Sequence, residues 1–222
     1  MSHPPLLIGI EARYLFAREK TGIENYTTQV VRALGRRADL PPVYLYTDGP
    51  PEPVDESVAE ILACPRLRVR VVPRRRGWLR LWLPLAARRD GVTVMHFPGT
   101  IVPGWKPFRA VVTVHDLAAL QVPHLAYGND TRVVNTVVRR SVRRSAHVLA
   151  VSQSTARDVQ RFFGVSPSRI TVTYEAADPR FRPVEGARAR VAERFGLRGR
   201  YLLFVGTPFR RKNLEGVMAA LP

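Results

Sequence analysis

The stretch "HVLAVSQSTARDVQRFFGVSPSRITVTY", residues 147–174, reads as a strand, a helix and a second strand in immediate succession. Its first part is apolar, and Ser152 or Ser154 can cap a helix that starts directly after that strand. A turn at the glycine then leads into the second strand. Strands that are apolar throughout and alternate with helices indicate a parallel sheet covered on both sides. The segment therefore predicts an α/β fold.

The same alternation continues toward the N-terminus. The run "AVVTVHD", residues 110–116, is a continuous apolar strand, and the helix predicted after it, "VVNTVVRRSVRRSA", has a basic outer face. Together these patterns predict a Rossmann-like, doubly wound parallel sheet. A loop rich in proline and acidic residues is predicted at residues 50–56. The remaining predicted strands are residues 6–10, 42–47, 66–72 and 92–99, and the remaining helices are residues 23–37 and 77–91, the latter interrupted by Pro84.

After residue 174 the sequence changes character, because proline, glycine and charged residues dominate residues 175–200. This composition indicates a linker with one short helix at about residues 186–195. The last stretch, "LLFVGTPFRRKNLEGVMAALP", predicts a strand, a basic loop and a helix from Asn213. One such unit cannot bury its own apolar face. We expect Leu214, Val217, Met218 and Leu221 to be partly exposed, and we expect two domains, residues 1–180 and a truncated second one in residues 181–222.

Composition limits the class of protein. The hydrophobic content of 45% in 222 residues is enough for a packed core. The first residues lack the features of a secretory signal, and no apolar run approaches the roughly 20 residues of a spanning helix. Cys64 is the single cysteine, which excludes an internal disulfide framework and a cysteine-cluster metal site. These features favour the cytoplasm.

The net charge of +17 comes almost wholly from arginine, since Lys20, Lys106 and Lys212 are the three lysines. Such a charge implies an anionic neighbour: a nucleic acid, an anionic membrane surface or a phosphorylated small molecule. A genome that favours arginine codons would produce the same charge on solvated faces without any partner. The clusters at residues 74–76 and 139–145 favour a partner over that explanation.

Polar residues gather where predicted strands end. Ligands of open α/β sheets bind outside the carboxyl ends of the strands, so these residues are the candidates for one crevice. They form five groups: residues 21–26, residues 97–100, His115 with Asp116, residues 152–155 and residues 207–213.

Three of these groups suggest specific chemistry. Gly22 precedes a helix N-terminus, where free N–H groups favour a phosphate, although a plain turn glycine is equally compatible. His115 can donate a hydrogen bond or act as an acid or base, or form a structural pair with Asp116. Lys212 and its neighbouring arginines, before the last predicted helix, can hold a diphosphate. The four histidines in the body of the chain lack the close spacing of metal ligands, which speaks against a metal site.

Taken in order, several stretches resemble the retaining glycosyltransferases of family 4, also called group 1, which have the two-domain GT-B fold. They are "TGIENYTTQVVRAL", "MHFPGTIVP", "VVTVHDL", "HVLAVSQSTARDVQRFFGVSPSRITVTYEAADPRF" and "LLFVGTPFRRKNL", and they cover nearly the whole chain. The resemblance implies a first domain that binds the acceptor and a second that binds a nucleotide-sugar donor. It also implies metal-independent transfer with retention, and the "TGI-x-x-Y" subgroup suggests mannose as the sugar.

The resemblance also assigns roles to residues of this chain. His115 would contact the transferred sugar as the catalytic residue, and the loop at Gly22 would approach the donor phosphates. Lys212 matches the lysine that holds the diphosphate. Thr207 stands where the family often has arginine, so that role falls to Arg210 or Arg211, or is absent from this chain. The family's E-x7-E pair would lie beyond Pro222. The residues expected to bind donor phosphate are Gly22, Thr207, Arg211 and Lys212, and those expected to line the cleft or bind acceptor are Thr21, Tyr26, Asp116 and Ser152.

The expected partners are a nucleotide-sugar, a glycan or lipid-linked acceptor and an anionic membrane surface at the inner face of the membrane, with no cofactor and no nucleic acid. The alternative is a basic module that binds nucleic acid or another polyanion, based on the charge of +17. That alternative lacks a stacking platform and a nucleic-acid motif. An oxidoreductase ranks last, because the pattern G-x-G-x-x-G is absent after the first strand.

Overall fold

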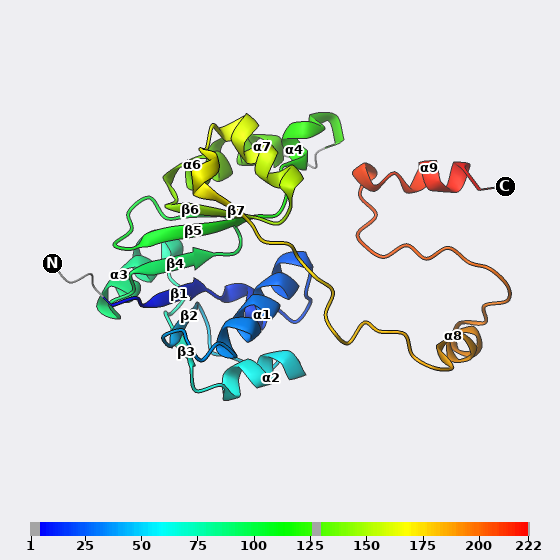
Figure 1. Cartoon of the computed structure of the whole chain (residues 1–222), viewed down its shortest axis with the longest axis horizontal. Coiled ribbons are helices and arrows are strands. Elements are labelled where there is room, and N and C mark those ends of the chain that lie inside the picture. Colours follow the sequence, from blue (N-terminus) through cyan, green and yellow to red (C-terminus); the bar gives the residue numbers. More distant parts are fainter. Residues whose placement is uncertain (1–4, 126–129, 222) are drawn as a thin grey trace.

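Seven parallel strands form one sheet in the computed structural model, which describes residues 5–125 and 130–221 (Figure 1). The strand order is β3-β2-β1-β4-β5-β6-β7, and every neighbouring pair is parallel. The order reverses between β1 and β4, so the predicted doubly wound, Rossmann-like sheet is confirmed. The strands are β1 (Ile8–Glu11), β2 (Val43–Thr47), β3 (Leu67–Val71), β4 (Val94–Phe97), β5 (Arg109–Val114), β6 (His147–Ala150) and β7 (Ile170–Val172).

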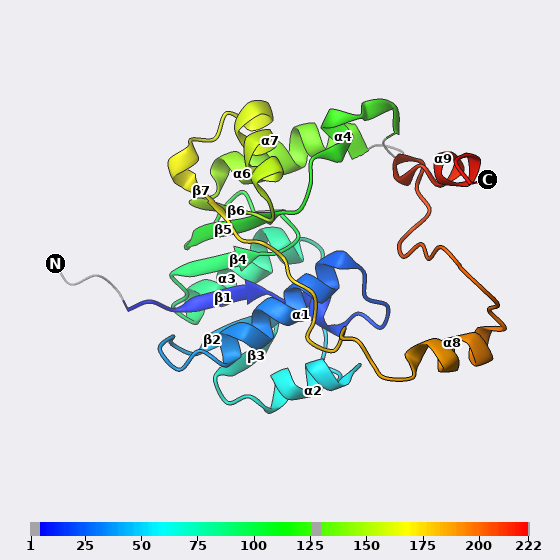
Figure 2. The same cartoon turned by 45° about the vertical axis from the view of Figure 1, so that its right-hand side comes forward.

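Two separate apolar cores join the helices to the sheet. One contains Ile10 and Leu45 of the sheet together with Val31 of α1 (Gly22–Gly35) and Ile61 of α2 (Glu56–Ala63). The other contains Met95 and Val112 with the apolar sides of three further helices. Helices therefore cover both sides of the sheet (Figure 2). The second set is α3 (Leu83–Arg89), α6 (Arg139–Arg144) and α7 (Gln153–Phe163).

Local signals explain where the main helices begin. The hydroxyl of Ser152 accepts a hydrogen bond of 3.0 Å from the Thr155 N–H, so Ser152, of the two predicted serines, caps α7. At the start of α1, the Glu24 carboxylate accepts hydrogen bonds from the N–H and the hydroxyl of Thr21. The predicted helix at residues 77–91 becomes a π-helical turn, Trp78–Trp82, followed by α3 with Pro84 in its first turn. Proline is tolerated there because the first turn needs no N–H donor.

Several helices differ from the prediction. The predicted loop at residues 50–56 leads into α2, which the sequence reading missed, and Asp55 caps that helix by accepting a 2.9 Å hydrogen bond from the Val58 N–H. The helix predicted at residues 133–146 is built in three pieces: α5 (Asp130–Val133), a π-helical segment (Val134–Val138) and α6. Short helices without a predicted counterpart are Arg13–Phe16, α4 (Ala118–Gln121), Pro123–Leu125, Pro167–Arg169 and Arg210–Lys212.

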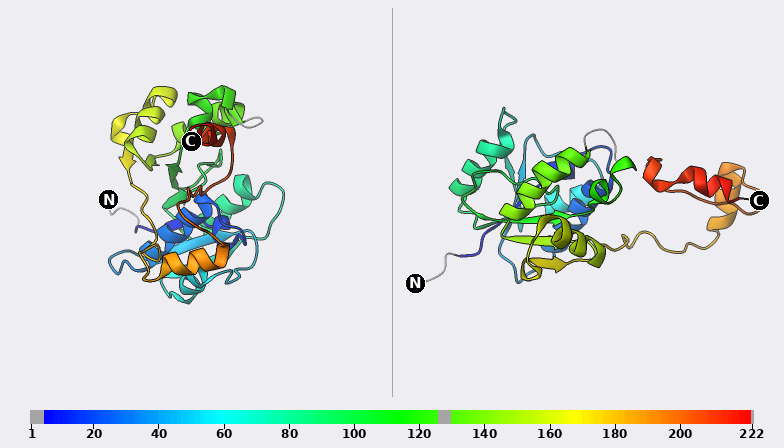
Figure 3. Two further views of the ribbon diagram at one scale, coloured as in Figure 1. Left: turned by 90° about the vertical axis from the view of Figure 1, so that its right-hand side faces the viewer. Right: turned by 90° about the horizontal axis from the view of Figure 1, so that it is seen from above.

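The chain after β7 crosses over α1 and then leaves the sheet (Figures 2 and 3). Asp178 fastens this crossing: it accepts a 2.6 Å hydrogen bond from Gln29 of α1 and lies 3.8 Å from the Arg32 guanidinium. The N–H of Arg180 donates to the same carboxylate at 2.9 Å and holds the pKa of Asp178 below its usual value. Asp178 thus ties this segment to α1.

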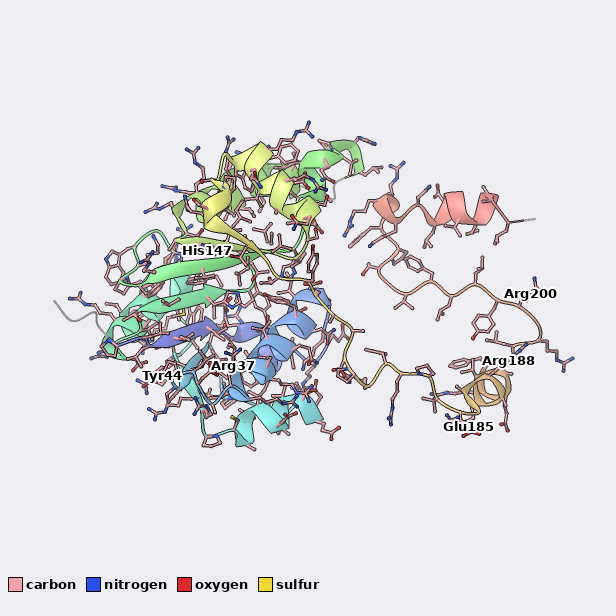
Figure 4. The ribbon with its side chains drawn as sticks, viewed as in Figure 1. Arg37, Tyr44, His147, Glu185, Arg188 and Arg200 are labelled. Carbon is pink, nitrogen blue, oxygen red and sulfur yellow. The ribbon has the colours of Figure 1, made fainter. Side chains whose placement is uncertain are left out.

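The expected strand at residues 201–205 is wrong. These residues form no strand among the described part of the chain, and Val205 is 84% exposed, because no neighbouring strand accepts their hydrogen bonds. The predicted short helix is confirmed as α8 (Ala187–Phe195), and the last helix is α9 (Leu214–Ala219). Val217, Met218 and Leu221 are exposed and Leu214 is partly buried, as expected. Figure 4 shows Glu185, Arg188 and Arg200 on this segment, away from the sheet. The division into two domains after residue 180 stays a prediction.

Candidate functional site

His115 lies at the centre of a polar cluster at the carboxyl ends of the strands. It follows β5 directly, so its position next to the switch point of the sheet is fixed by the parallel register. The ring of Tyr26, from α1, meets the imidazole edge to face at 4.8 Å between centroids. The Tyr26 hydroxyl lies 2.9 Å from the hydroxyl of Thr113, two residues before His115. The first helix and the fifth strand therefore meet at this histidine.

Both ring nitrogens of His115 face hydrogen-bond acceptors. Nε2 lies 3.2 Å from the carbonyl oxygen of Pro98, and Nδ1 lies 3.1 Å from the carboxylate of Glu175. The Thr155 hydroxyl donates to the His115 carbonyl at 3.2 Å, which fixes the backbone as well. An imidazolium, with an N–H on each nitrogen, satisfies both acceptors. The partner of the ring is Glu175, and the structural pair with Asp116 considered from the sequence is wrong.

The loop after β4 is tightly constrained. A Cβ on Gly99 would overlap the hydroxyl of Tyr14, so glycine allows these two segments to touch. Thr100 has a φ of 67°, a conformation that non-glycine residues rarely adopt, and its hydroxyl donates to the Thr113 carbonyl. These contacts hold the Pro98 carbonyl where it meets His115.

A second histidine lies beneath the cluster. His96 of β4 is 8% exposed, and its Nε2 lies 2.8 Å from the Thr113 hydroxyl. Burial disfavours its charged form and nearby His115 adds to the effect, which lowers the pKa of His96 to about 4 from 6.5. The folded protein therefore holds His96 neutral at neutral pH.

This neutral state predicts an acid sensitivity. Between pH 6.5 and about 4 the unfolded chain binds a proton at this position that the folded chain does not, so stability falls as the pH falls. We expect a loss of about 3 kcal/mol from His96 across that interval. Urea unfolding across this pH range measures it. A His96→Gln variant serves as control, and equal pH dependence in both proteins would contradict the assignment.

Four of the five predicted polar groups meet around His115. His115 contacts one residue from each of three other groups: Tyr26 from residues 21–26, Pro98 from residues 97–100 and Thr155 from residues 152–155. Thr21 and Gly22 form the start of α1: a Cβ on Gly22 would meet no atom within 4 Å, whereas the Thr21 N–H is already bonded to the Glu24 carboxylate.

The fifth group, residues 207–213, approaches the cluster through Arg211. Arg211 lies 4.0 Å from the carboxylate of Asp116, whose other oxygen accepts a 3.1 Å hydrogen bond from the Ala118 N–H. A cavity of about 360 Å³ lies beside this contact. It is lined by Asp116, His124, apolar residues between Ala118 and Val134, and Phe209, Arg210 and Arg211. Within the described part of the chain, no hydrogen bond or ion pair joins Thr207 or Lys212 to His115. The phosphate-binding roles of Thr207, Arg211 and Lys212 stay predictions.

Two acidic residues of the site region were missed by the sequence reading. Glu175 lies 60 positions from His115 in a segment assigned to a linker. Glu11 ends β1 at the switch point, is 3% exposed, and pairs with the Arg13 guanidinium at 2.7 Å. Burial raises the pKa of Glu11, and the charge and hydrogen bonds of Arg13 act against that rise. An acidic residue directly after the apolar run "LLIGI" is the signal that could have drawn attention to Glu11.

Among residues 5–125 and 130–221, no three histidine, cysteine, aspartate or glutamate side chains are grouped as a metal ion requires. Metal independence stays a prediction. Over the same described residues, every helix is too short or too polar to span a bilayer.

Comparison with known proteins places this site in a wider context. A family model described as Glycosyltransferase Family 4 matches residues 20–181. The chain is also similar to the O-antigen chain mannosyltransferase B of Escherichia coli, with 27% identity over 150 residues. That match covers 67% of this chain and 37% of the relative, so the chain spans little more than a third of the relative's length.

Proposed function

The chain belongs to glycosyltransferase family 4, and on this premise we propose that it binds the acceptor and part of the donor in a retaining sugar transfer. The proposed donor is a nucleotide-sugar, and the proposed acceptor is a glycan or a glycolipid. Mannose is the sugar we propose first, supported by the name of the mannosyltransferase relative. The proposed location is the cytoplasm, at the inner face of the membrane.

The geometry around His115 is the observation that carries this proposal. The side chain of His115 is 22% exposed and that of Glu175 is 49% exposed, so both are accessible to a solute. A sugar hydroxyl can insert between them, because it accepts a hydrogen bond from the imidazole and donates one to the carboxylate. Tyr26 and the Pro98 carbonyl keep the ring in place while this exchange occurs. His115 thereby positions the sugar for transfer.

The departing diphosphate needs positive charge that is fixed before the reaction. We propose that backbone N–H groups of the first turn of α1, at Gly22 and beside the Thr21–Glu24 cap, face the diphosphate, and that Arg211 and Lys212 supply cations. Such preorganised charge is usually a large catalytic contribution. We propose that Thr207 assists this group, and that Thr21, Asp116 and Ser152 line the acceptor side of the cleft. We propose that no metal ion takes part.

A donor panel tests the proposal. The protein in its native length is incubated with guanosine- and uridine-diphosphate sugars, including mannose, and with glycan and lipid-linked acceptors, with and without a chelator. We expect transfer from one donor, an unchanged rate with the chelator, and retained configuration at the anomeric carbon by NMR. An inverted product would contradict the retaining mechanism. Salt-dependent DNA binding without any transfer would favour the polyanion-binding alternative.

A further inference from the structure

A surface patch on the side of α6 combines exposed apolar side chains with arginines. It is formed by the turn Trp78–Trp82, residues 101–106, and the helical stretch 134–144. Trp105 is 46% exposed, Ile101 41% and Val137 40%. The cations of this surface, which we call the basic patch, are Arg80, Lys106, Arg139, Arg140, Arg143 and Arg144.

The apolar side chains of the basic patch are held in place. The Val102 N–H donates to the Ser141 hydroxyl at 3.1 Å, and Arg144 donates to the Gly104 carbonyl at 2.7 Å. These bonds fasten residues 101–106 to α6, so Ile101 and Trp105 stand on a rigid base. A groove of about 540 Å³ runs between this loop, the turn Trp78–Trp82 and the helix. A shallower depression of about 320 Å³ adjoins it, lined by Thr136 and four arginines.

The charge of the basic patch is not compensated. None of its six cations lies within ion-pair distance of a carboxylate among the side chains that the structure describes. On α1, by contrast, Arg32 and Arg36 both pair with Glu60 at 2.6–2.7 Å. Burial lowers the pKa of Lys106 from its usual value, and the positive charge of nearby Arg144 adds to this effect. An anionic partner would remove this repulsion.

We propose that the basic patch binds an anionic lipid bilayer. This proposal rests on the location at the inner face of the membrane proposed above, and it names the residues that would hold the protein there. Arginines bind lipid phosphates through paired N–H groups, and their stems cover apolar surface while the heads stay at the interface. Trp105 supplies the amphipathic ring that prefers the membrane–water boundary, and Ile101 and Val137 contact acyl chains. These exposed aliphatic side chains fit acyl chains better than a nucleic acid, whose phosphate backbone is bound by polar and cationic groups.

The same helical stretch connects the basic patch to the cleft. Val133 and Val134 line the cavity beside Asp116, whereas Thr136, Val137 and Arg140 line the groove of the patch. A bilayer bound at the patch therefore lies one to two helical turns from the cleft. A lipid-linked acceptor could reach the cleft without leaving the membrane.

Vesicle co-sedimentation of the full chain tests this surface. The vesicles are phosphatidylcholine alone, or phosphatidylcholine with an equal part of phosphatidylglycerol. The variant Arg139→Glu/Arg143→Glu reverses two patch charges, and Arg157→Glu/Arg161→Glu on α7 is the matched control with the same spacing and charge change. We expect the patch variant to lose at least about tenfold in partitioning to anionic vesicles, and the control to lose much less. Trp105→Ala should also weaken binding, at high salt as well as low.

Three results would overturn the proposal: equal losses in the patch variant and its control, equal binding to neutral vesicles, or binding to DNA with the patch but not to lipid. The first would mean that net charge alone drives binding. Circular dichroism and the urea midpoint show that each variant is folded, and Trp105→Ala, at an exposed position, tests the patch without charge reversal. Vesicle binding needs no sugar substrate, so its failure leaves the proposed transfer reaction standing.

Discussion

Replacing His115 with alanine lowers kcat/KM for sugar transfer by about 10²–10³-fold, the usual cost of removing one preorganised hydrogen-bond donor. The change removes the donor that meets the sugar hydroxyl and leaves Glu175 without its partner. The free energy of unfolding should change little, because the ring is partly exposed. Steady-state kinetics of the native-length protein with its donor and acceptor measure the effect.

His147 provides the matched control for that experiment. It starts β6, away from the cleft, and its Nε2 lies 2.8 Å from the Thr171 hydroxyl (Figure 4). His147→Ala should leave kcat/KM within about twofold of the unchanged protein, as expected for a surface change. Glu175→Gln keeps a hydrogen-bonding side chain and should retain more activity than His115→Ala. Equal losses in His115→Ala and His147→Ala would remove the role assigned to His115.

Arg13→Ala is expected to destabilise the fold by about 3–5 kcal/mol, because it leaves a buried carboxylate without its partner. Glu11 is 3% exposed, and the Arg13 guanidinium at 2.7 Å is its ion-pair partner. Arg13 also lies 4.6 Å above the Trp78 ring, and this cation–π contact is lost as well. Urea unfolding should show a lower midpoint with an unchanged slope.

Two comparisons isolate the buried charge as the cause. Arg37→Ala removes an equally short pair with Asp39 at 2.6 Å, but both side chains are more than 60% exposed and screened by water, so we expect a far smaller loss than for Arg13→Ala. Arg13→Ala should cost less at acidic pH, because the unpaired Glu11 takes up a proton and becomes neutral. The double variant Glu11→Gln/Arg13→Ala should recover much of the loss. A loss independent of pH would point to packing instead.

Most strands of the sheet could be predicted because they are short apolar runs bounded by turn residues, whereas β3 alternates arginine with apolar residues. Helix α2 was missed because it is only eight residues long and directly follows a loop rich in proline and acidic residues. The run "LLFV", residues 202–205, has the same apolar pattern as the true strands. It forms no strand, since a strand needs a hydrogen-bonding neighbour that composition alone does not reveal.

The candidate site was predictable where residues follow strands directly. His115 and Ser152 come at the ends of β5 and β6, so the parallel sheet places both at one edge. Glu175 was not predictable, because its contact with His115 depends on the path of the chain after β7. The buried pair of Glu11 and Arg13 was missed because burial of a charge is decided by packing rather than by its sequence neighbours.

The segment after β7 is attached at two points, through Glu175 to His115 and through Asp178 to α1. A sugar hydroxyl that inserts between His115 and Glu175 releases or lengthens the first attachment. Occupancy of the cleft and freedom of the following chain are then coupled, and the coupling is reciprocal. Loosening the segment by a change at Asp178 should alter sugar affinity, and a bound sugar should alter the mobility of the segment. The mobility of the segment that holds Glu175 and Asp178 would thus depend on whether a sugar is bound at His115.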